Sequence, residues 1–227
     1  MSLELLDNVF WHSLNGVQAR FSQGTDVARR YAVGFSPIVA FAEPRRPDFD
    51  ALLPYCDVGD HFYCAGWSGP APANWTIDAA ASMFQMVWAG EAPPADDTLA
   101  MTPLEGRHAP QMVALATLVP PGPFGLRTVE LGVYLGVFDG VQLVAMAGER
   151  SAAGALREVS GVCTHPDFQG RGYARALMLA VIRLQLARQQ IPFLHVMENN
   201  VNAHRMYVRM GFRIHQSLAV RVVTRVR

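Results

Sequence analysis

The sequence contains no lysine, and its 19 basic residues are all arginine. These arginines balance 19 acidic residues, so the formal net charge is zero at pH 7. Proteins that attract nucleic acid or an anionic membrane surface carry an excess of basic residues. The charge balance therefore argues against both kinds of partner, and we attribute the missing lysines to a coding bias toward GC-rich codons.

Cysteine is scarce as well, with only Cys56, Cys64 and Cys163 in the chain. An odd number without metal-like spacing predicts neither a disulfide framework nor a zinc site. No apolar run approaches the length of a membrane span, and the first residues lack the pattern of a signal peptide. These absences favour a cytoplasmic protein that has no metal and no membrane partner.

The length of 227 residues, of which 51% are hydrophobic, suits one large domain or two small ones. Residues 91–97 contain two prolines and three acidic residues, which predicts a linker. We therefore expect an N-terminal α/β domain at residues 1–100 and a second domain at residues 101–227. The first is either an unrelated α/β unit or a degenerate duplicate of the second.

Several local signals predict secondary structure. Asp139-Gly140 between two apolar runs predicts a β-hairpin, and Ala109-Pro110 predicts the start of a helix. A strand is expected at Phe84–Trp88, although the longer segment that contains it, residues 77–89, also fits a helix. The helix expected at residues 173–190 is apolar nearly all round, so we expect the N-terminal half or a second subunit to cover its outer side.

Residues 158–175 are the most informative stretch of the chain. An apolar, β-branched run predicts a strand, Pro166 ends it, and Gly170 and Gly172 permit a tight turn into a helix. The first N–H groups of a helix have no partner inside it, and the helix dipole adds positive charge there. The stretch therefore predicts a binding site for the phosphates of a cofactor, or else a tight connection that binds nothing.

Two common nucleotide motifs do not fit this loop. A P-loop ends in Gly-Lys-Ser/Thr, which is absent from the chain. The dinucleotide fingerprint needs Gly or Ala three residues after Gly172, where the chain has Arg175.

The pattern Gln169-x-x-Gly172-x-Ala174 resembles the acyl-CoA pyrophosphate loop of the GNAT N-acetyltransferase superfamily. A second segment, from Asn200 through Ala203 and Tyr207 to Gly211-Phe212, resembles another signature of that superfamily. The resemblance covers roughly residues 108–227. Within the superfamily, the segments 121–124, 145–150 and 160–166 look like a bacterial subgroup similar to the C-terminal domain of glycine N-acyltransferase-like proteins.

This resemblance implies a mixed, mostly antiparallel sheet flanked by helices, which is an α/β (α+β) fold. It implies acetyl-CoA as the cofactor, with backbone groups of Val162 and Thr164 on the pantetheine arm and the amides of residues 169–175 on the pyrophosphate. The residues expected to contact coenzyme A are Val162, Cys163, Thr164, Gln169, Gly170, Arg171, Gly172, Tyr173, Ala174, Arg175, Asn200, Ala203 and Tyr207.

Two residues are candidates for catalysis. A phenol titrates near ~10, so Tyr207 can protonate the leaving thiolate, although an aromatic ring packed on the sheet is the alternative. Glu158, at the start of the strand, is the candidate base, and an apolar strand could raise its pKa. The alternatives are a carboxylate paired with Arg150 or Arg157, and a chain of water molecules as the base.

Other polar residues near the loop receive simpler interpretations. Cys163 is a small buried hydrophobe rather than a thiol that becomes acylated. Gly161 predicts a β-bulge in the strand. His195 is expected to be a satisfied core or pocket-lining residue, and no histidine is assigned to catalysis.

The sequence thus predicts an acetyl-CoA-dependent N-acetyltransferase that acts on an amine of a small molecule or peptide, as a monomer or homodimer. The alternative is a non-catalytic sensor that binds acyl-CoA through the same loop. We expect the acceptor pocket to be formed by the N-terminal half, the 119–134 loop and the final strands. Large aromatic residues of the N-terminal half are expected in the core.

Overall fold

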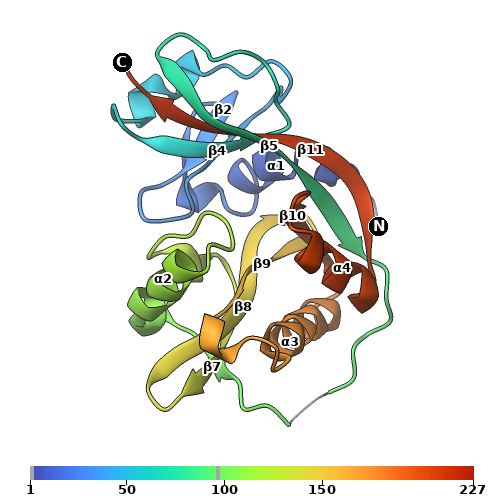
Figure 1. Ribbon diagram of the computed structural model, residues 1–227. Helices are drawn as coiled ribbons and strands as arrows, with labels where there is room; N and C mark the ends of the chain where they lie inside the picture. Colours follow the sequence, from blue (N-terminus) through green and yellow to red (C-terminus); the bar gives the residue numbers. More distant parts are fainter. Residues whose placement is uncertain (1–2, 96–97) are drawn as a thin grey trace.

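The computed structural model describes residues 3–95 and 98–227, and in these residues eleven strands form one mixed sheet (Figure 1). The strands of the first half are β1 (Ser22–Gly24), β2 (Ala28–Tyr31), β3 (Ile38–Phe41), β4 (His61–Ala65) and β5 (Trp75–Trp88). Those of the second half are β6 (Thr102–Pro103), β7 (Tyr134–Asp139), β8 (Gln142–Ala153), β9 (Leu156–Thr164), β10 (Ile191–Met197) and β11 (Phe212–Arg225). The α-helices are α1 (Val9–Leu14), α2 (Ala109–Leu118), α3 (Tyr173–Ala187) and α4 (Val201–Met210).

The order of the strands nearly mirrors itself about the centre of the sheet. It runs β1-β2-β3-β4-β11-β5-β10-β9-β8-β7-β6. With β6 left out, β1 to β5 correspond in turn to β7 to β11. Replacing each strand by its counterpart gives the same order read from the other end of the sheet. In each half the first three neighbouring pairs are antiparallel, antiparallel and parallel. The expected mixed and mostly antiparallel sheet is therefore confirmed.

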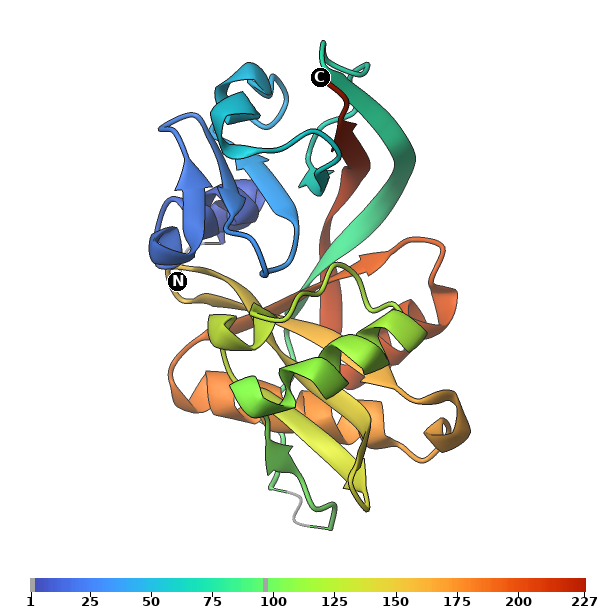
Figure 2. The ribbon, with the colours of Figure 1, turned by 90° about the vertical axis from the view of Figure 1, so that its left-hand side faces the viewer.

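The two longest strands cross from one half to the other. Strands β5 and β11 have 14 residues each and pair with one another along most of their length. Strand β5 also pairs with β10 of the second half, whereas β11 pairs with β4 of the first half. Figure 2 shows both strands curving between the halves. The strand expected at Phe84–Trp88 is the last part of β5.

Local sequence signals account for much of the second half. Gly140 has a φ of 56° in the turn between β7 and β8, as the Asp-Gly signal predicts. Pro110 lies in the first turn of α2, where its missing N–H has no cost. Gly161 has a φ of 64° at a register shift between β8 and β9, so the predicted bulge is confirmed.

Strand β2 was not expected, because two of its four residues are arginines. Arg30 is nevertheless buried, and its guanidinium donates a hydrogen bond of 2.9 Å to Asp60. The same guanidinium lies over the ring of Phe62, 4.7 Å from its centroid. These contacts satisfy the charge and let a polar sequence form an inner strand.

The segment that follows β5 lies against α3, which differs from our expectation for this helix. Figure 1 shows residues 89–95 and 98–101 passing on the outer side of α3, and Arg183 donates a hydrogen bond of 3.1 Å to the carbonyl of Pro94. Leu99 and Met101 pack against the core cluster that contains the inner side chains of α3. The contacts with α3 thus come from the segment around the expected linker rather than from the strands and helices of the first half. Asp96 and Asp97 of the expected linker lie outside the described residues.

Aromatic side chains of the first half fill the core, as expected. Trp11, Phe35, Trp67 and Trp75 are at most 7% exposed, and Trp88 is partly buried. Helix α1 packs on β8, so the first half is joined to the second by apolar contacts as well as by strands. No helix in residues 3–95 and 98–227 has the length and apolar character needed to cross a membrane.

Candidate functional site

The loop between β9 and α3 presents a row of free backbone amides. After the 3₁₀ turn Pro166–Phe168, Gly170 and Gly172 adopt φ values of 75° and 81°. In the described residues, no group accepts a hydrogen bond from the amides of residues 170–175. The amide of Gln169 is different, because it donates to the carbonyl of Pro166 at 3.2 Å. The predicted set of amides that could hold an anion is therefore shorter by one residue.

The two arginines of this loop have different positions. Arg175 lines a cavity that begins at the loop. The side chain of Arg171 turns back, lies 4.6 Å above the ring of Phe168 and donates to the carbonyl of Asp167. Arg175 therefore places positive charge in the cavity, whereas Arg171 stabilises the loop itself. Arg209, in the last turn of α4, also lines the cavity and was not expected from any sequence signal.

Strands β9 and β10 separate beside the loop and open the cavity between them. They pair only over residues 156–158 and 191–193, so the edge of β9 that faces β10 is unpaired from residue 159 onward. The cavity has a volume of about 1000 Å³ and is lined by Val162, Cys163 and Thr164. A buried hydroxyl, Oγ1 of Thr164, has no hydrogen-bond partner in the part of the chain that the structure describes. Unsatisfied buried groups of this kind are typical of binding sites.

Cys163 is a small buried side chain, as we expected, rather than a reactive thiol. It is 3% exposed, and burial raises the pKa of its thiol to about 12. The thiol therefore stays protonated near neutral pH and is a poor nucleophile.

Helix α4 brings the second signature to the same cavity. The side chain of Asn200 accepts a hydrogen bond of 3.2 Å from the amide of Ala203, so it caps the helix while it lines the cavity. Tyr207 lies one turn further along, 8% exposed, with its ring 6.1 Å from that of Phe212. Burial raises the pKa of Tyr207 to about 12, so its hydroxyl keeps its proton throughout the neutral range. Both residues thus line the same cavity as residues of the loop.

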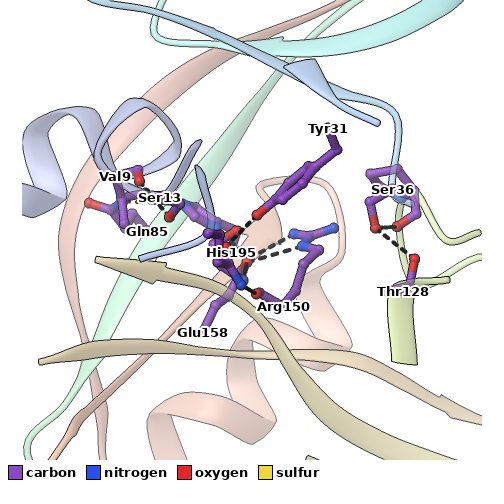
Figure 3. Close-up of polar contacts among 12 residues, drawn as sticks. Val9, Ser13, Tyr31, Ser36, Gln85, Thr128, Arg150, Glu158 and His195 are labelled. Atoms are coloured by element: carbon purple, nitrogen blue, oxygen red, sulfur yellow. Dashed lines mark hydrogen bonds and ion pairs between the residues drawn. The ribbon is translucent and has the colours of Figure 1, made fainter. Parts of the chain in front are cut away.

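Glu158 lies at the point where β9 and β10 separate, and it is fully bonded (Figure 3). Arg150 donates to both of its oxygens, at 3.0 Å from Nε and 2.7 Å from Nη2. The amide of Ser151 and Nδ1 of His195 donate to it as well, at 3.1 and 2.8 Å. Burial alone would raise the pKa of Glu158, but the charge of Arg150 and the bond from His195 outweigh it. Its pKa is well below the usual value, so the expected upward shift is wrong.

His195 connects this carboxylate to a chain of buried amides. Because a carboxylate only accepts, Nδ1 of His195 carries the proton, and Nε2 accepts from the side-chain amide of Gln85 at 3.1 Å. Gln85 in turn accepts a bond of 2.9 Å from Gln216. A register shift in β11 next to Gln216 accompanies this contact. His195 also lines the cavity, as one of the two interpretations of this residue predicted.

The cavity continues past His195 into the first half of the chain. Its far end is lined by apolar and aromatic residues of α1, β3, β4, β5 and β11, namely Phe10, Ile38, Tyr63, Cys64, Ala65, Met83 and Val220. The turn at residues 119–123 closes one side. These are the three regions expected to form an acceptor pocket, although no motif identified the individual residues.

Comparison with known proteins agrees with this geometry. Residues 134–221 match the family described as FR47-like protein. A search of curated proteins found no match. Among solved structures, a GNAT-family protein from Novosphingobium aromaticivorans is 32% identical, with a TM-score of 0.87 over 97% of this chain and 98% of that one.

Two further solved structures share the fold at low identity. A GCN5-related N-acetyltransferase-like protein from Streptococcus suis is 14% identical, with a TM-score of 0.60 over 94% of this chain and 92% of its own. A GCN5-related N-acetyltransferase from Kribbella flavida is 16% identical, with a TM-score of 0.57 over 96% of this chain and 94% of its own. The match over nearly the whole chain at 32% identity is the stronger finding. It establishes that the chain belongs to the GNAT family of N-acetyltransferases and is an acyl-transferring enzyme.

Proposed function

We propose that the protein transfers an acetyl group from acetyl-CoA to an amine carried by a small molecule or a peptide. The observation that supports this most directly is one cavity that joins the free amides of residues 170–175 to Tyr207 and His195. Phosphate oxygens would accept from these amides, with positive charge from Arg175 and the dipole of α3. The unpaired edge of β9 at residues 162–164 would hold the pantetheine arm. Acetyl-CoA would supply the acetyl group as a reactive thioester.

Tyr207 is the general acid in this proposal. Tyr207 lines the cavity beside Asn200 and Ala203 of the same helix. A phenol with a pKa of about 12 is protonated at neutral pH and can give its proton to a departing thiolate.

Glu158 acts through His195 in this proposal. The four hydrogen bonds to the carboxylate leave it no direct route to the acceptor amine, whereas His195 lies between it and the cavity. Glu158 would stabilise a proton taken up by the imidazole, as the carboxylate of a catalytic triad does. Because Gln85 donates to Nε2, uptake of a proton by this nitrogen requires the Gln85 amide to turn its oxygen toward the ring and to give up the bond that this oxygen accepts from Gln216.

The replacement Tyr207→Phe tests the role of the acid. We expect the rate of thiol release from acetyl-CoA, measured with a panel of amines, to fall by about 100-fold, the usual contribution of a general acid. The affinity for coenzyme A, measured by calorimetry, should stay within twofold because the ring remains. An unchanged rate would remove Tyr207 from the mechanism. Binding of coenzyme A without turnover of any amine by the wild-type protein would favour the sensor function instead.

We also propose that residues 1–100 and 101–227 are two related units and that only the second binds the cofactor. The mirrored strand order and matching pair directions support the relationship. After β3, at the position that corresponds to the phosphate loop, residues 42–47 contain two prolines and no glycine. The three cysteines are free and buried, which suits the reducing cytoplasm that we propose as the location.

A further inference from the structure

The charges that face the cavity are of one sign. Arg150, Arg175 and Arg209 line it, and none of its lining residues in the described chain is Asp or Glu. Arg175 and Arg209 lie at the end next to the phosphate loop, on α3 and α4. A site for polyamines or other amines with several positive charges needs acidic side chains to neutralise them. The far end of this cavity is therefore poorly suited to a polycation.

Arg150 has hydrogen-bonding capacity left. A guanidinium has five N–H donors, and Glu158 engages only Nε and one hydrogen of Nη2. No group in the described residues accepts from Nη1, although the side chain is only 9% exposed. A Cβ built on Gly122 would lie 3.8 Å from Nη1, which places this nitrogen beside the turn that closes the cavity. The Nη1–Nη2 edge thus remains available for a second carboxylate.

Tyr134 supplies another donor without a partner at the same place. Its residue is 1% exposed, and its hydroxyl has no hydrogen-bond partner in the described part of the chain. A Cβ built on Gly161, which lines the cavity, would lie 3.4 Å from this hydroxyl. Phe124 of the neighbouring turn packs edge-on against the ring of Tyr134 at 5.8 Å. Arg150, which lines the cavity, and Tyr134, which lies behind its lining residue Gly161, are therefore two buried donors beside residues 122–124.

We infer that the acceptor is an amine that also carries a carboxylate and an apolar or aromatic body, as an apolar α-amino acid does. The carboxylate accepts hydrogen bonds from the free edge of Arg150 and from the hydroxyl of Tyr134. The apolar body lies against residues such as Phe10, Ile38 and Tyr63 at the far end. The amine is then held near His195. This inference rests on the proposed function, because it names the acceptor of that transfer.

Binding of matched ligands tests the carboxylate site without any turnover. Calorimetry compares 3-phenylpropanoate with 3-phenylpropan-1-ol, which differ in the anion alone. We expect the carboxylate to bind wild-type protein at least tenfold more tightly. Tyr134→Phe should weaken the carboxylate by about five- to tenfold and the alcohol by less than twofold, since only a charge-assisted hydrogen bond is lost. Because that hydroxyl has no partner in residues 3–95 and 98–227, the variant should remain folded.

Two controls make the result specific. Tyr55→Phe makes the same chemical change at an exposed residue outside the cavity and should leave both affinities unchanged. Inorganic pyrophosphate, which would occupy the phosphate loop, should not compete with 3-phenylpropanoate, which excludes that loop as its site. The inference is overturned if the alcohol binds as tightly as the carboxylate, or if Tyr134→Phe weakens both ligands equally or neither.

Turnover gives a second comparison that separates this inference from the proposed function. With acetyl-CoA, kcat/KM for L-phenylalanine should exceed that for L-phenylalaninamide by at least tenfold. Equal values would overturn the carboxylate site while leaving acetyl transfer intact. If no amine is acetylated, the proposed function fails, and the binding comparison still decides whether the anion site exists.

Discussion

Replacing Glu158 by glutamine is expected to lower the free energy of unfolding by about 3–5 kcal/mol, the usual cost of removing one partner from a buried ion pair. The reason is that Arg150 would keep its charge in a buried site without the carboxylate that balances it. Urea denaturation at pH 7 measures the change. Thiol release should also fall by at least tenfold, because His195 loses the group that orients it.

Glu130→Gln is the matched control. Glu130 pairs with Arg127 at the surface at 2.8 Å, and its loss should cost less than about 1 kcal/mol. A similar cost for both variants would contradict the importance of burial at Glu158.

The pH dependence of the same variant follows from the direction of the pKa shift. The folded-state pKa of Glu158 is lowered, so its stabilising contribution is complete above the unfolded value of 4.5 and is lost as the pH falls through the folded value. The stability difference between wild type and Glu158→Gln should therefore be constant from pH 5 to 8 and shrink in more acidic solution. A difference that shrinks between pH 6 and 8 would show that another group dominates.

Replacing Gly172 by glutamate is expected to weaken coenzyme A binding by at least about 100-fold, which corresponds to about 2.7 kcal/mol. A carboxylate would lie among the amides of residues 170–175 and repel the phosphates that they are proposed to hold. The φ of 81° adds strain for any residue with a Cβ. Calorimetry with coenzyme A measures the loss.

Gly59→Glu controls for strain and for the added charge. Gly59 also has a positive φ, of 93°, and nothing lies within 4 Å of a Cβ built there, but it is outside the cavity. This variant should bind coenzyme A as the wild type does. If Gly172→Glu bound coenzyme A within threefold of the wild type, the phosphates would lie elsewhere.

Features that depend on a short stretch of sequence were predictable. The turn at Gly140, the start of α2 at Pro110 and the bulge at Gly161 each follow from the backbone freedom or restriction of one residue. The loop between β9 and α3, which we propose to bind phosphate, is of the same kind, since its glycines and the start of α3 are contiguous. The position of Tyr207 relative to the loop followed from the resemblance to a known family.

Features that depend on distant segments were not predictable. Arg150, Glu158 and His195 come from three neighbouring strands, and the pairing of those strands is set by the whole sheet. The pKa of Glu158 is lowered because Arg150 and His195 contact its carboxylate. The apolar strand alone suggested a raised pKa, which is the wrong sign. Cover of α3 by the segment after β5 likewise depends on the path of the chain. Strand β2 was missed because its arginine is satisfied by Asp60, 30 residues away.

The place of β11 in the sheet sets the order in which the nascent chain can fold. Strands β4 and β5 do not pair with each other, because β11 lies between them, and β11 follows every other described strand in the sequence. Until residues 212–225 are synthesised, both strands keep an open hydrogen-bonding edge, which is a template for aggregation. The first half of this protein therefore completes its sheet only after residues 212–225 have been synthesised, and its yield in cells should depend on chaperones that shield these edges.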